Sequence, residues 1–107
     1  MKIEYSQSFL RQAKQLAKKF KLLKQDLQQA VQDIQTNQNL GVELGNNLFK
    51  KRVKNSSIPT GKSGGFRIII YAELKNSIVL IAIYSKTEKD TLTDAELSKL
   101  IESYISF

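Results

Sequence analysis

The sequence predicts one α+β domain, in which a small antiparallel β-sheet packs on an N-terminal helical hairpin and is followed by a C-terminal helix. Helical periodicity dominates residues 6–36, alternating strand patterns fill residues 48–85, and a helix-capping motif follows at residue 93. A chain of 107 residues suffices for one modest hydrophobic core but not for two. We therefore expect residues 1–107 to form a single domain.

The first predicted element is a strand over residues 1–5, because Ile3 and Tyr5 alternate onto one face. Either Ser6 or Ser8 can then cap a helix, since both hydroxyls can accept a bond from the first free backbone N–H groups. The apolar residues of that helix recur at helical spacing: Phe9, Ala13, Leu16, Ala17 and Phe20. A basic stripe of Arg11, Lys14, Lys18 and Lys21 follows another face, and it is either a solvated surface or a phosphate contact.

A second helix is predicted over residues 26–36, completing a hairpin with the first. Asn37, Gln38 and Asn39, followed by Gly41, should end it, because Asn and Gly accept the left-handed backbone conformation. Residues 40–47 are interpreted as a connector that closes with a turn at residues 45–47.

Three strands are predicted next, over Leu48–Val53, Phe66–Glu73 and residues 78–85. The last of these is almost wholly apolar, so we expect it inside the sheet and covered for much of its length. The loop over residues 55–65 precedes the second strand, and residues 74–77 form a hairpin turn before the third. Thr93 and Glu96 form a capping box, which predicts the terminal helix.

Alternation in the first of these strands separates two faces. Phe49 and Val53 should face the helices, which places Lys50 and Arg52 together on the opposite, open face. Two-residue spacing likewise puts Tyr84 and Lys86 on one face at the end of the apolar strand. Each of these residues alone is more often structural than functional, but together with Arg67 they form a face of cations and one phenol that suits phosphodiesters.

Composition favours an anionic partner. The chain has 17 Lys plus Arg against 10 Asp plus Glu, a formal net charge of +7. Residues 48–67 contain six cations and no acid: Lys50, Lys51, Arg52, Lys54, Lys62 and Arg67. A nucleic acid or an acidic protein would neutralise such a segment, and an anionic membrane surface is the weaker option.

The sequence also excludes several chemistries. It contains no Cys and no His, so it lacks a thiol nucleophile, a thiolate metal site, and the commonest general base and metal ligand. We expect no metal or other cofactor, and a reducing cytoplasm suits a chain without cysteine. The first residues include Glu4 and no apolar run, so we expect no signal peptide, and no apolar run is long enough for a membrane helix.

One nucleotide-binding motif is rejected. Gly61-Lys62-Ser63 resembles the end of a P-loop, but Ser56 stands where that motif requires glycine, and a strand rather than a helix follows. The glycines at 64 and 65 are interpreted instead as a tight bend that aims Lys62 and Arg67, with an ordinary hairpin turn as the alternative.

RNA cleavage by the substrate's own 2′-hydroxyl requires a base, a stabiliser of the phosphorane charge, and an acid for the leaving oxygen. Arg67 and Arg52 suit charge stabilisation, because a guanidinium stays protonated and binds two phosphate oxygens. Lys50 or Lys86 is a candidate base or acid, since neighbouring cations favour loss of a Lys proton. Tyr84 could stack on a base or position the phosphate.

At these residues the sequence resembles the RelE/ParE superfamily of type II toxin–antitoxin toxins, and most closely its HigB-like RelE branch. The specific segments are FKKRV at residues 49–53, GKSGGFR at 61–67 and IYSKTEK at 83–89, followed by residues 92–97. The resemblance covers nearly the whole chain. It implies the RelE-like fold, which agrees with the order of elements predicted above.

The resemblance also implies an activity and partners. It points to an mRNA interferase, a metal-independent endoribonuclease that enters the ribosomal A site, cuts the codon there, and is inhibited by an acidic antitoxin. The toxin–antitoxin complex would contact operator DNA through the antitoxin. By the same resemblance, six residues fall on positions that the family uses to bind and cleave RNA: Lys50, Arg52, Lys62, Arg67, Tyr84 and Lys86. We take Arg67, Tyr84, Lys86, Lys50 and Arg52 as the catalytic candidates, and Lys62, Lys51, Lys54 and Lys89 as the RNA-binding candidates.

Two alternatives stay open. A ParE-like member of the same fold would inhibit DNA gyrase by protein contact and cleave nothing, although such proteins tend to lack the Lys, Arg and Tyr set. A passive RNA-binding module would use the basic face only to hold phosphate.

Overall fold

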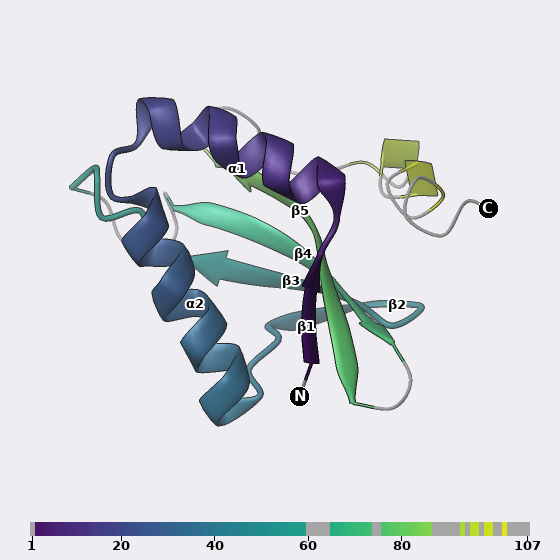
Figure 1. Cartoon of the computed structure of the whole chain (residues 1–107). Coiled ribbons are helices and arrows are strands. Elements are labelled where there is room, and N and C mark those ends of the chain that lie inside the picture. The colour runs from purple at the N-terminus through teal and green to yellow at the C-terminus, as the bar shows by residue number, and fades with distance from the viewer. Residues whose placement is uncertain are drawn as a thin grey trace.

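The computed structural model describes residues 2–59, 65–73 and 76–86, together with residues 93, 95–96, 98–99 and 102. The helices and strands are, in chain order, β1 (Lys2–Tyr5), α1 (Gln7–Lys19), α2 (Leu23–Asn37), β2 (Val42–Gly45), β3 (Leu48–Val53), β4 (Phe66–Glu73) and β5 (Ser77–Ser85). The strands form one five-stranded sheet of order β1-β5-β4-β3-β2, and both helices cover one face of it (Figure 1). The α+β class and the strands β3, β4 and β5 are as predicted.

The sheet is antiparallel except at one edge. β2 with β3, β3 with β4 and β4 with β5 are antiparallel, whereas β1 runs parallel to β5 and pairs Ile3 with Ile78. The prediction of a wholly antiparallel sheet is therefore wrong at β1. Parallel neighbours need a long crossover, and the two helices with the three intervening strands supply it.

β2 is a strand where the sequence predicted only a connector. Three of its four residues pair with the first three residues of β3, with a register irregularity between Glu43 and Gly45. This edge strand was hard to predict from the sequence because it is short, exposed and bounded by glycines. The turn that follows is as predicted, because Asn46 and Asn47 both have positive φ, 52° and 64°, as tight hairpins require.

The helices begin and end close to their predicted positions. Ser6 caps α1, and its Oγ accepts a hydrogen bond of 3.0 Å from Phe9 N. α2 begins at Leu23, three residues earlier than predicted, and ends where Gln38 adopts the left-handed conformation with φ 52°. Figure 1 shows the two helices at a wide angle, so they diverge rather than lying side by side as a close hairpin.

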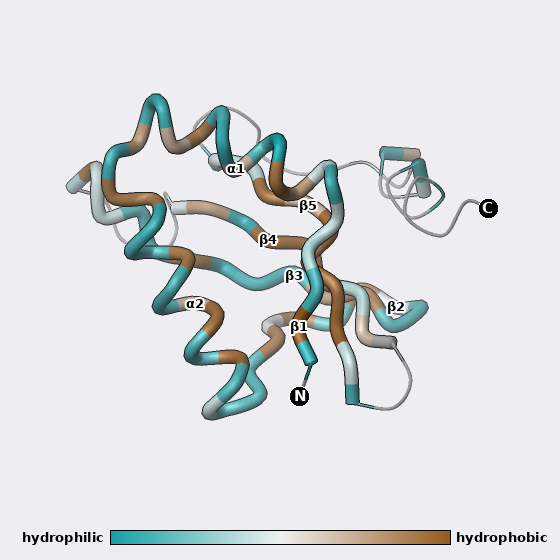
Figure 2. The backbone as a smooth tube through the Cα atoms, viewed as in Figure 1, coloured by the Kyte–Doolittle hydropathy of each residue, from teal (hydrophilic) through white to brown (hydrophobic). Residues whose placement is uncertain are grey.

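The main core lies between the helices and the sheet. Phe20 of α1 packs edge-on against Phe66 of β4, with ring centroids 5.4 Å apart. The other buried members of this core are Phe9, Leu16, Leu23, Ala30, Ile34, Val53, Ile68, Ile70, Ile78, Leu80 and Ile83. Figure 2 shows β5 coloured hydrophobic for most of its length, in agreement with its predicted place between two other strands.

A second apolar cluster lies on the face of the sheet opposite the helices. It consists of Leu48, Ile69, Val79, Ile81 and Ala82, with Tyr71 and Tyr84 packed against it. The face that the sequence predicted to be open therefore has a buried apolar floor through its middle. The charged candidate residues of this face lie beside that floor, on β3 and β4.

β5 contains a β-bulge in the middle of this cluster. Ile69 pairs with Ala82 but Ile70 pairs with Leu80, so Ile81 is an extra residue in β5. The bulge reverses the alternation of the strand: Leu80 belongs to the helix-side core, yet Ala82 lies on the opposite face.

Beyond β5 the chain is described only in part. The capping box is present, since Glu96 N donates to Thr93 Oγ1 at 3.1 Å and Thr93 N donates to Glu96 Oε1 at 3.1 Å. The predicted C-terminal helix is not among the described elements, because most of its residues lie outside the described ranges. No helix within the described ranges is long and apolar enough to cross a membrane.

Candidate nucleic-acid interface

Three candidate residues lie side by side across the sheet. Arg52 of β3 is paired with Arg67 of β4, and Arg67 is paired with Tyr84 of β5. Directly opposite residues place their Cβ atoms about 5 Å apart on the same face. Arg52, Arg67 and Tyr84 are called the cationic row below, and they lie on the face opposite the helices.

Lys50 lies one row further along the same face. It is paired with Ile69, which belongs to the apolar floor, and its side chain is half-buried. Four of the five catalytic candidates, Lys50, Arg52, Arg67 and Tyr84, therefore lie on one face of the sheet. The apolar floor beside them is what the sequence did not predict.

The bulge in β5 is what places Tyr84 on this face. Val79 lies on the same face as Tyr84, although strict alternation over an odd separation would put the two on opposite faces. The extra residue, Ile81, shifts the pattern by one. Without it Tyr84 would point into the helix-side core, and Ile83 would replace it in the cationic row.

Polar side chains at the start of α1 and within it form hydrogen bonds with backbone groups of β5 around the bulge. β1 pairs with β5 only as far as Leu80. Beyond it, Ser6 Oγ donates to Ile81 O at 2.7 Å, and Gln12 Oε1 accepts from Ile83 N at 3.0 Å. The same Ser6 oxygen caps α1, so one side chain ties the helix start to the bulge. The sequence suggested Ser6 as a cap, but nothing in it indicated Gln12.

Arg67 is buried although it carries a charge. Only 2% of it is exposed, and its Nη1 donates to the carbonyl of Phe66 at 3.2 Å. Arg52 beside it is exposed. Two like charges directly opposite one another in a sheet destabilise the pairing. Such a violation of a local folding rule is typical of a functional site.

Lys54 and Lys86 flank the cationic row at the end of the sheet. Both are exposed, and Lys86 N donates to Gly65 O at 3.0 Å, which extends the pairing of β4 and β5 past the last strand residue. Gly65 is required here, because a Cβ atom would lie 2.1 Å from Val53 O. This close approach keeps β3 and β4 together beside both lysines.

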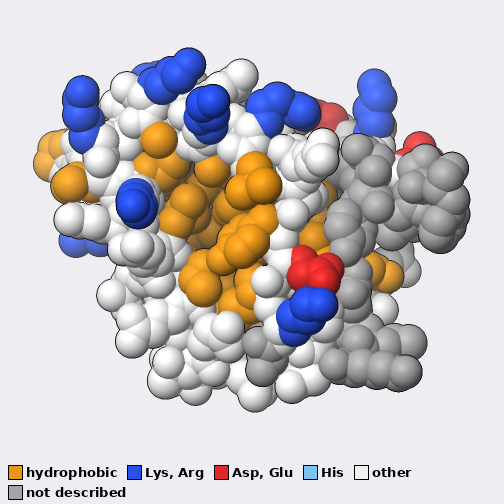
Figure 3. Space-filling view, viewed as in Figure 1, with side chains coloured by type: hydrophobic (Ala, Val, Ile, Leu, Met, Phe, Trp, Pro, Cys, Tyr) orange, Lys and Arg blue, Asp and Glu red, His pale blue; other side chains and the backbone are white. Residues whose placement is uncertain are grey.

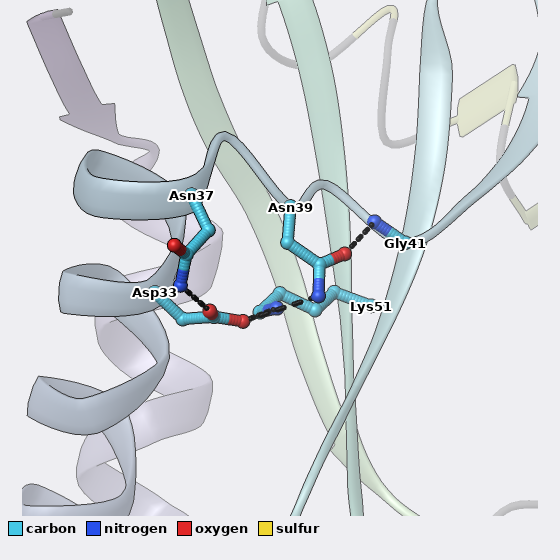
Figure 4. A network of polar contacts seen from close by, with 5 residues as sticks. All are labelled: Asp33, Asn37, Asn39, Gly41 and Lys51. Atoms are coloured by element: carbon cyan, nitrogen blue, oxygen red, sulfur yellow. Dashed lines mark hydrogen bonds and ion pairs between the residues drawn. The ribbon is translucent and has the colours of Figure 1, made fainter.

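Lys51 lies on the other face of the sheet. It is 5% exposed, and its Nζ forms an ion pair of 2.7 Å with Asp33 of α2. Figure 4 shows Asn37 and Asn39 donating to the same carboxylate. The bonds from Lys51 and Asn37 hold the pKa of Asp33 below its usual value. The structure therefore separates Lys51 from the other candidates and gives it a helix-to-sheet contact.

A second carboxylate anchors the segment that follows β3. Asp26 of α2 accepts from both Ser56 N, at 2.8 Å, and Ser56 Oγ, at 2.6 Å. Asp26 is 7% exposed, so these bonds satisfy a buried charge. Two RNA-binding candidates, Lys62 and Lys89, lie outside the residues that the structure describes.

The described residues in and beside the cationic row include four exposed or half-buried cations in three neighbouring residue rows: Lys50, Arg52, Lys54 and Lys86. A guanidinium and ammonium groups in this arrangement bind phosphate oxygens, and the ring of Tyr84 offers a surface on which a base can stack. The arrangement suits a single-stranded polyanion that crosses the strands.

Comparison with known families agrees with the motifs of the sequence. Residues 1–104 match the family described as the RelE toxin of the RelE/RelB toxin–antitoxin system. A search of curated proteins finds no match to this chain. Because the family match spans nearly the whole sequence, the chain belongs to the RelE family of toxins from type II toxin–antitoxin systems.

Proposed function

We propose that this chain is a ribosome-dependent mRNA endonuclease that cleaves mRNA in the ribosomal A site and is inhibited by a RelB-type antitoxin. The observation that carries the proposal is the register that aligns Arg52, Arg67 and Tyr84 on one face, next to Lys50, in a RelE-family chain. The finer assignment to the HigB-like branch stays a prediction from the sequence motifs.

The proposed reaction uses the RNA as its own nucleophile. The 2′-oxygen attacks the adjacent phosphorus, the bond from phosphorus to the 5′-oxygen breaks, and a 2′,3′-cyclic phosphate and a 5′-hydroxyl result. One of Lys50 and Lys86 accepts the proton of the 2′-hydroxyl, and the other donates a proton to the leaving 5′-oxygen. No metal takes part in this scheme, and the RNA loses one proton and gains one.

Arg52 and Arg67 stabilise the additional charge of the phosphorane in this scheme. Arg52 is exposed, so RNA meets it first, whereas contact with Arg67 requires the groups around that buried guanidinium to rearrange. Tyr84 stacks on the neighbouring base, a role that the half-buried position of its ring beside the apolar floor supports.

The test is to map mRNA 5′ ends by primer extension after brief induction of the chain in a bacterial host. New ends at in-frame codon positions are expected with the wild-type chain, and they should disappear with Arg67→Ala and weaken with Tyr84→Ala, which removes the stacking ring. Lys24→Ala on α2 is the matched control, since it removes one exposed cation from the helix side of the molecule, where Lys24 lines a depression with Leu10 and Leu27 and not with Tyr84.

Other outcomes point to the alternatives. Growth arrest with intact transcripts would overturn the nuclease proposal in favour of a ParE-like gyrase inhibitor. Salt-dependent RNA binding without cleavage, weakened alike by each loss of a cation, would indicate a passive binder.

A further inference from the structure

A polar cavity of about 360 Å³ lies at the β3 end of the cationic row, between α2 and β3. Arg52, the exposed end member of the row, is one of its lining residues. The larger hollow between α1 and α2 is hydrophobic, as Figure 3 shows, and no member of the row lines it. The polar cavity is therefore a place where a ligand held by the row can also form directional hydrogen bonds.

The cavity exists because β2 ends before β3 does. β2 pairs with β3 only as far as Lys50, and α2 lies beside the rest of that edge. Gly41 approaches Lys50 O on the β2 side, whereas Gly65 approaches Val53 O on the β4 side. Since successive residues of a strand point their backbone groups to opposite edges, Arg52 presents its N–H and C=O to the open edge. A ligand in the cavity can use both groups.

Positive and negative charges are separated within the cavity. Arg52 and Lys54 are exposed, so they form its rim. Asp26 is 7% exposed and Asp33 is half-buried, so the two carboxylates lie deeper. A phosphate is attracted by the cations of the rim and repelled by the carboxylates. The part of a ligand that enters the cavity must therefore be free of negative charge and rich in hydrogen-bond donors.

The carboxylates retain acceptor capacity for such a ligand. A carboxylate can accept about four hydrogen bonds, two at each oxygen. Asp26 accepts one at each, because Ser56 Oγ donates to Oδ1 at 2.6 Å and Ser56 N donates to Oδ2 at 2.8 Å. Asp33 Oδ1 accepts from Asn37 alone among the described residues (Figure 4). Gln29, exposed on the α2 wall, adds an amide that can donate or accept.

These features match one nucleotide of single-stranded RNA. Adenine, cytosine and guanine each carry an exocyclic amino group that donates hydrogen bonds, and uracil carries none. Carboxylates and amides recognise such base edges, which single-stranded RNA exposes because its bases can be splayed out. Ala30 and Val53 supply apolar surface for the ring. Sites for larger ligands measure about 300 to 1,000 Å³, so this cavity suits a single base.

We propose that this cavity binds the base of the nucleotide whose phosphate lies at Arg52, and that it selects bases with an exocyclic amino group over uracil. Asp26 is the principal acceptor, and Gln29 is the second contact. The identity of the ligand as RNA rests on the proposed function. The cavity adds to that function a determinant of sequence preference, next to the groups that hold the phosphate.

Binding of mononucleotides tests the site without any cleavage. In a chain labelled for NMR spectroscopy, the side-chain amide of Gln29 and the backbone N–H of Ser56 should shift on titration with AMP, CMP or GMP. UMP should bind about tenfold more weakly, because it lacks the hydrogen bond to a charged acceptor. Inorganic phosphate should shift only the rim, at Arg52 and Lys54. Equal binding of the four nucleotides, or shifts confined to the rim, would overturn the proposal.

Substitutions on α2 provide a matched pair. Gln29→Ala should weaken GMP binding about threefold or more, whereas Gln25→Ala should change it less than about twofold, since Gln25 is exposed on the same helix and does not line the cavity. Asp26→Asn replaces one acceptor with a donor, so UMP should no longer be the weakest ligand. An unchanged preference in a folded Asp26→Asn variant would refute the role of Asp26. If that variant does not fold, the ranking by the wild-type chain and the two Gln variants decide.

Other outcomes separate this site from the proposed function. A chain that prefers amino-bearing mononucleotides but cleaves no mRNA would refute the proposed function and leave the site intact. A chain that cleaves mRNA but binds all four mononucleotides alike would refute the site and leave the nuclease proposal intact. If no mononucleotide shifts Gln29 but a purified RelB-type antitoxin from the same genome does, the occupant is a protein and the assignment to RNA fails.

Discussion

Replacing Arg52 with threonine should make the fold more stable while weakening its action on RNA. Arg52 is directly opposite Arg67 in the β3–β4 ladder, and Arg67 is 2% exposed, so the repulsion acts beside a poorly solvated charge. Unfavourable cross-strand pairs cost a few tenths to about 1 kcal/mol. Threonine removes the repulsion and suits a strand, so we expect a gain of about 0.5 kcal/mol.

That gain corresponds to a rise in the thermal midpoint of roughly 2 to 4 °C for a chain of this size, measurable by circular dichroism or calorimetry. Lys54→Thr is the matched control. It removes one exposed cation from the same strand end, but Lys54 lies past the last β3–β4 pair, Val53 with Phe66. It should not reproduce the gain in stability expected for Arg52→Thr, because it removes no directly opposed charge.

A double-mutant cycle decides whether the repulsion is the cause. In an Arg67→Met background, which keeps the bulk of the buried side chain, Arg52→Thr should no longer stabilise. An equal gain in both backgrounds would refute the repulsion argument. So would destabilisation by Arg52→Thr alone, which would mean that the carboxylates of Asp26 and Asp33, which line the same cavity as Arg52, outweigh Arg67.

Three other predictions concern contacts that support the face. Asp33→Asn should lower the thermal midpoint more at pH 7 than at pH 3. The pKa of Asp33 is lowered by folding, so its contribution to stability is fully present above the unfolded pKa and decreases as the pH falls toward and through the folded pKa; an equal effect at both pH values would refute it. Ser6→Ala should cost about 1 to 2 kcal/mol in denaturant unfolding and reduce cleavage, because it removes the α1 cap and the bond to the bulge carbonyl, whereas Ser8→Ala should have little effect on either. Gly65→Ala should cost about 2 kcal/mol or more by the same measurement, since its Cβ would overlap Val53 O. Gly45→Asn should cost less, because a Cβ there meets open space and only the strain of the positive φ remains, which Asn tolerates better than most residues.

Much of the sheet could be predicted because the alternation of polar and apolar residues within one strand is a local pattern. Alternation in β3 correctly divided Phe49 and Val53 from Lys50 and Arg52, and the same rule placed Lys51 with the helix-facing residues. The sequence analysis nevertheless included Lys51 among the RNA-binding candidates. The ion pair with Asp33 could not be predicted, since it depends on how α2 lies over the sheet.

The features that could not be predicted from the sequence depend on the register and direction of strand pairing. The bulge at Ile81 lies within an unbroken apolar run, where one additional residue leaves no signal in hydropathy. The direction of β1 was equally hidden, because a strand pattern carries no information on whether its partner is parallel. Both depend on pairing between segments that are distant in the sequence. Ser6, which the sequence predicted as a helix cap, lies at this junction: its N–H donates to Leu80 O and its Oγ donates to Ile81 O.

The parallel pairing of β1 with β5 has a consequence for synthesis of the chain. About 70 residues separate the two strands, so β1 leaves the ribosome long before its only partner exists. At a rate of about 5 to 20 residues per second, the delay is roughly 4 to 14 s. The bulge contacts of Ser6 and Gln12 with β5 also wait for this event. A nascent chain therefore cannot complete the cationic row until the ribosome has translated its own message past the end of β5.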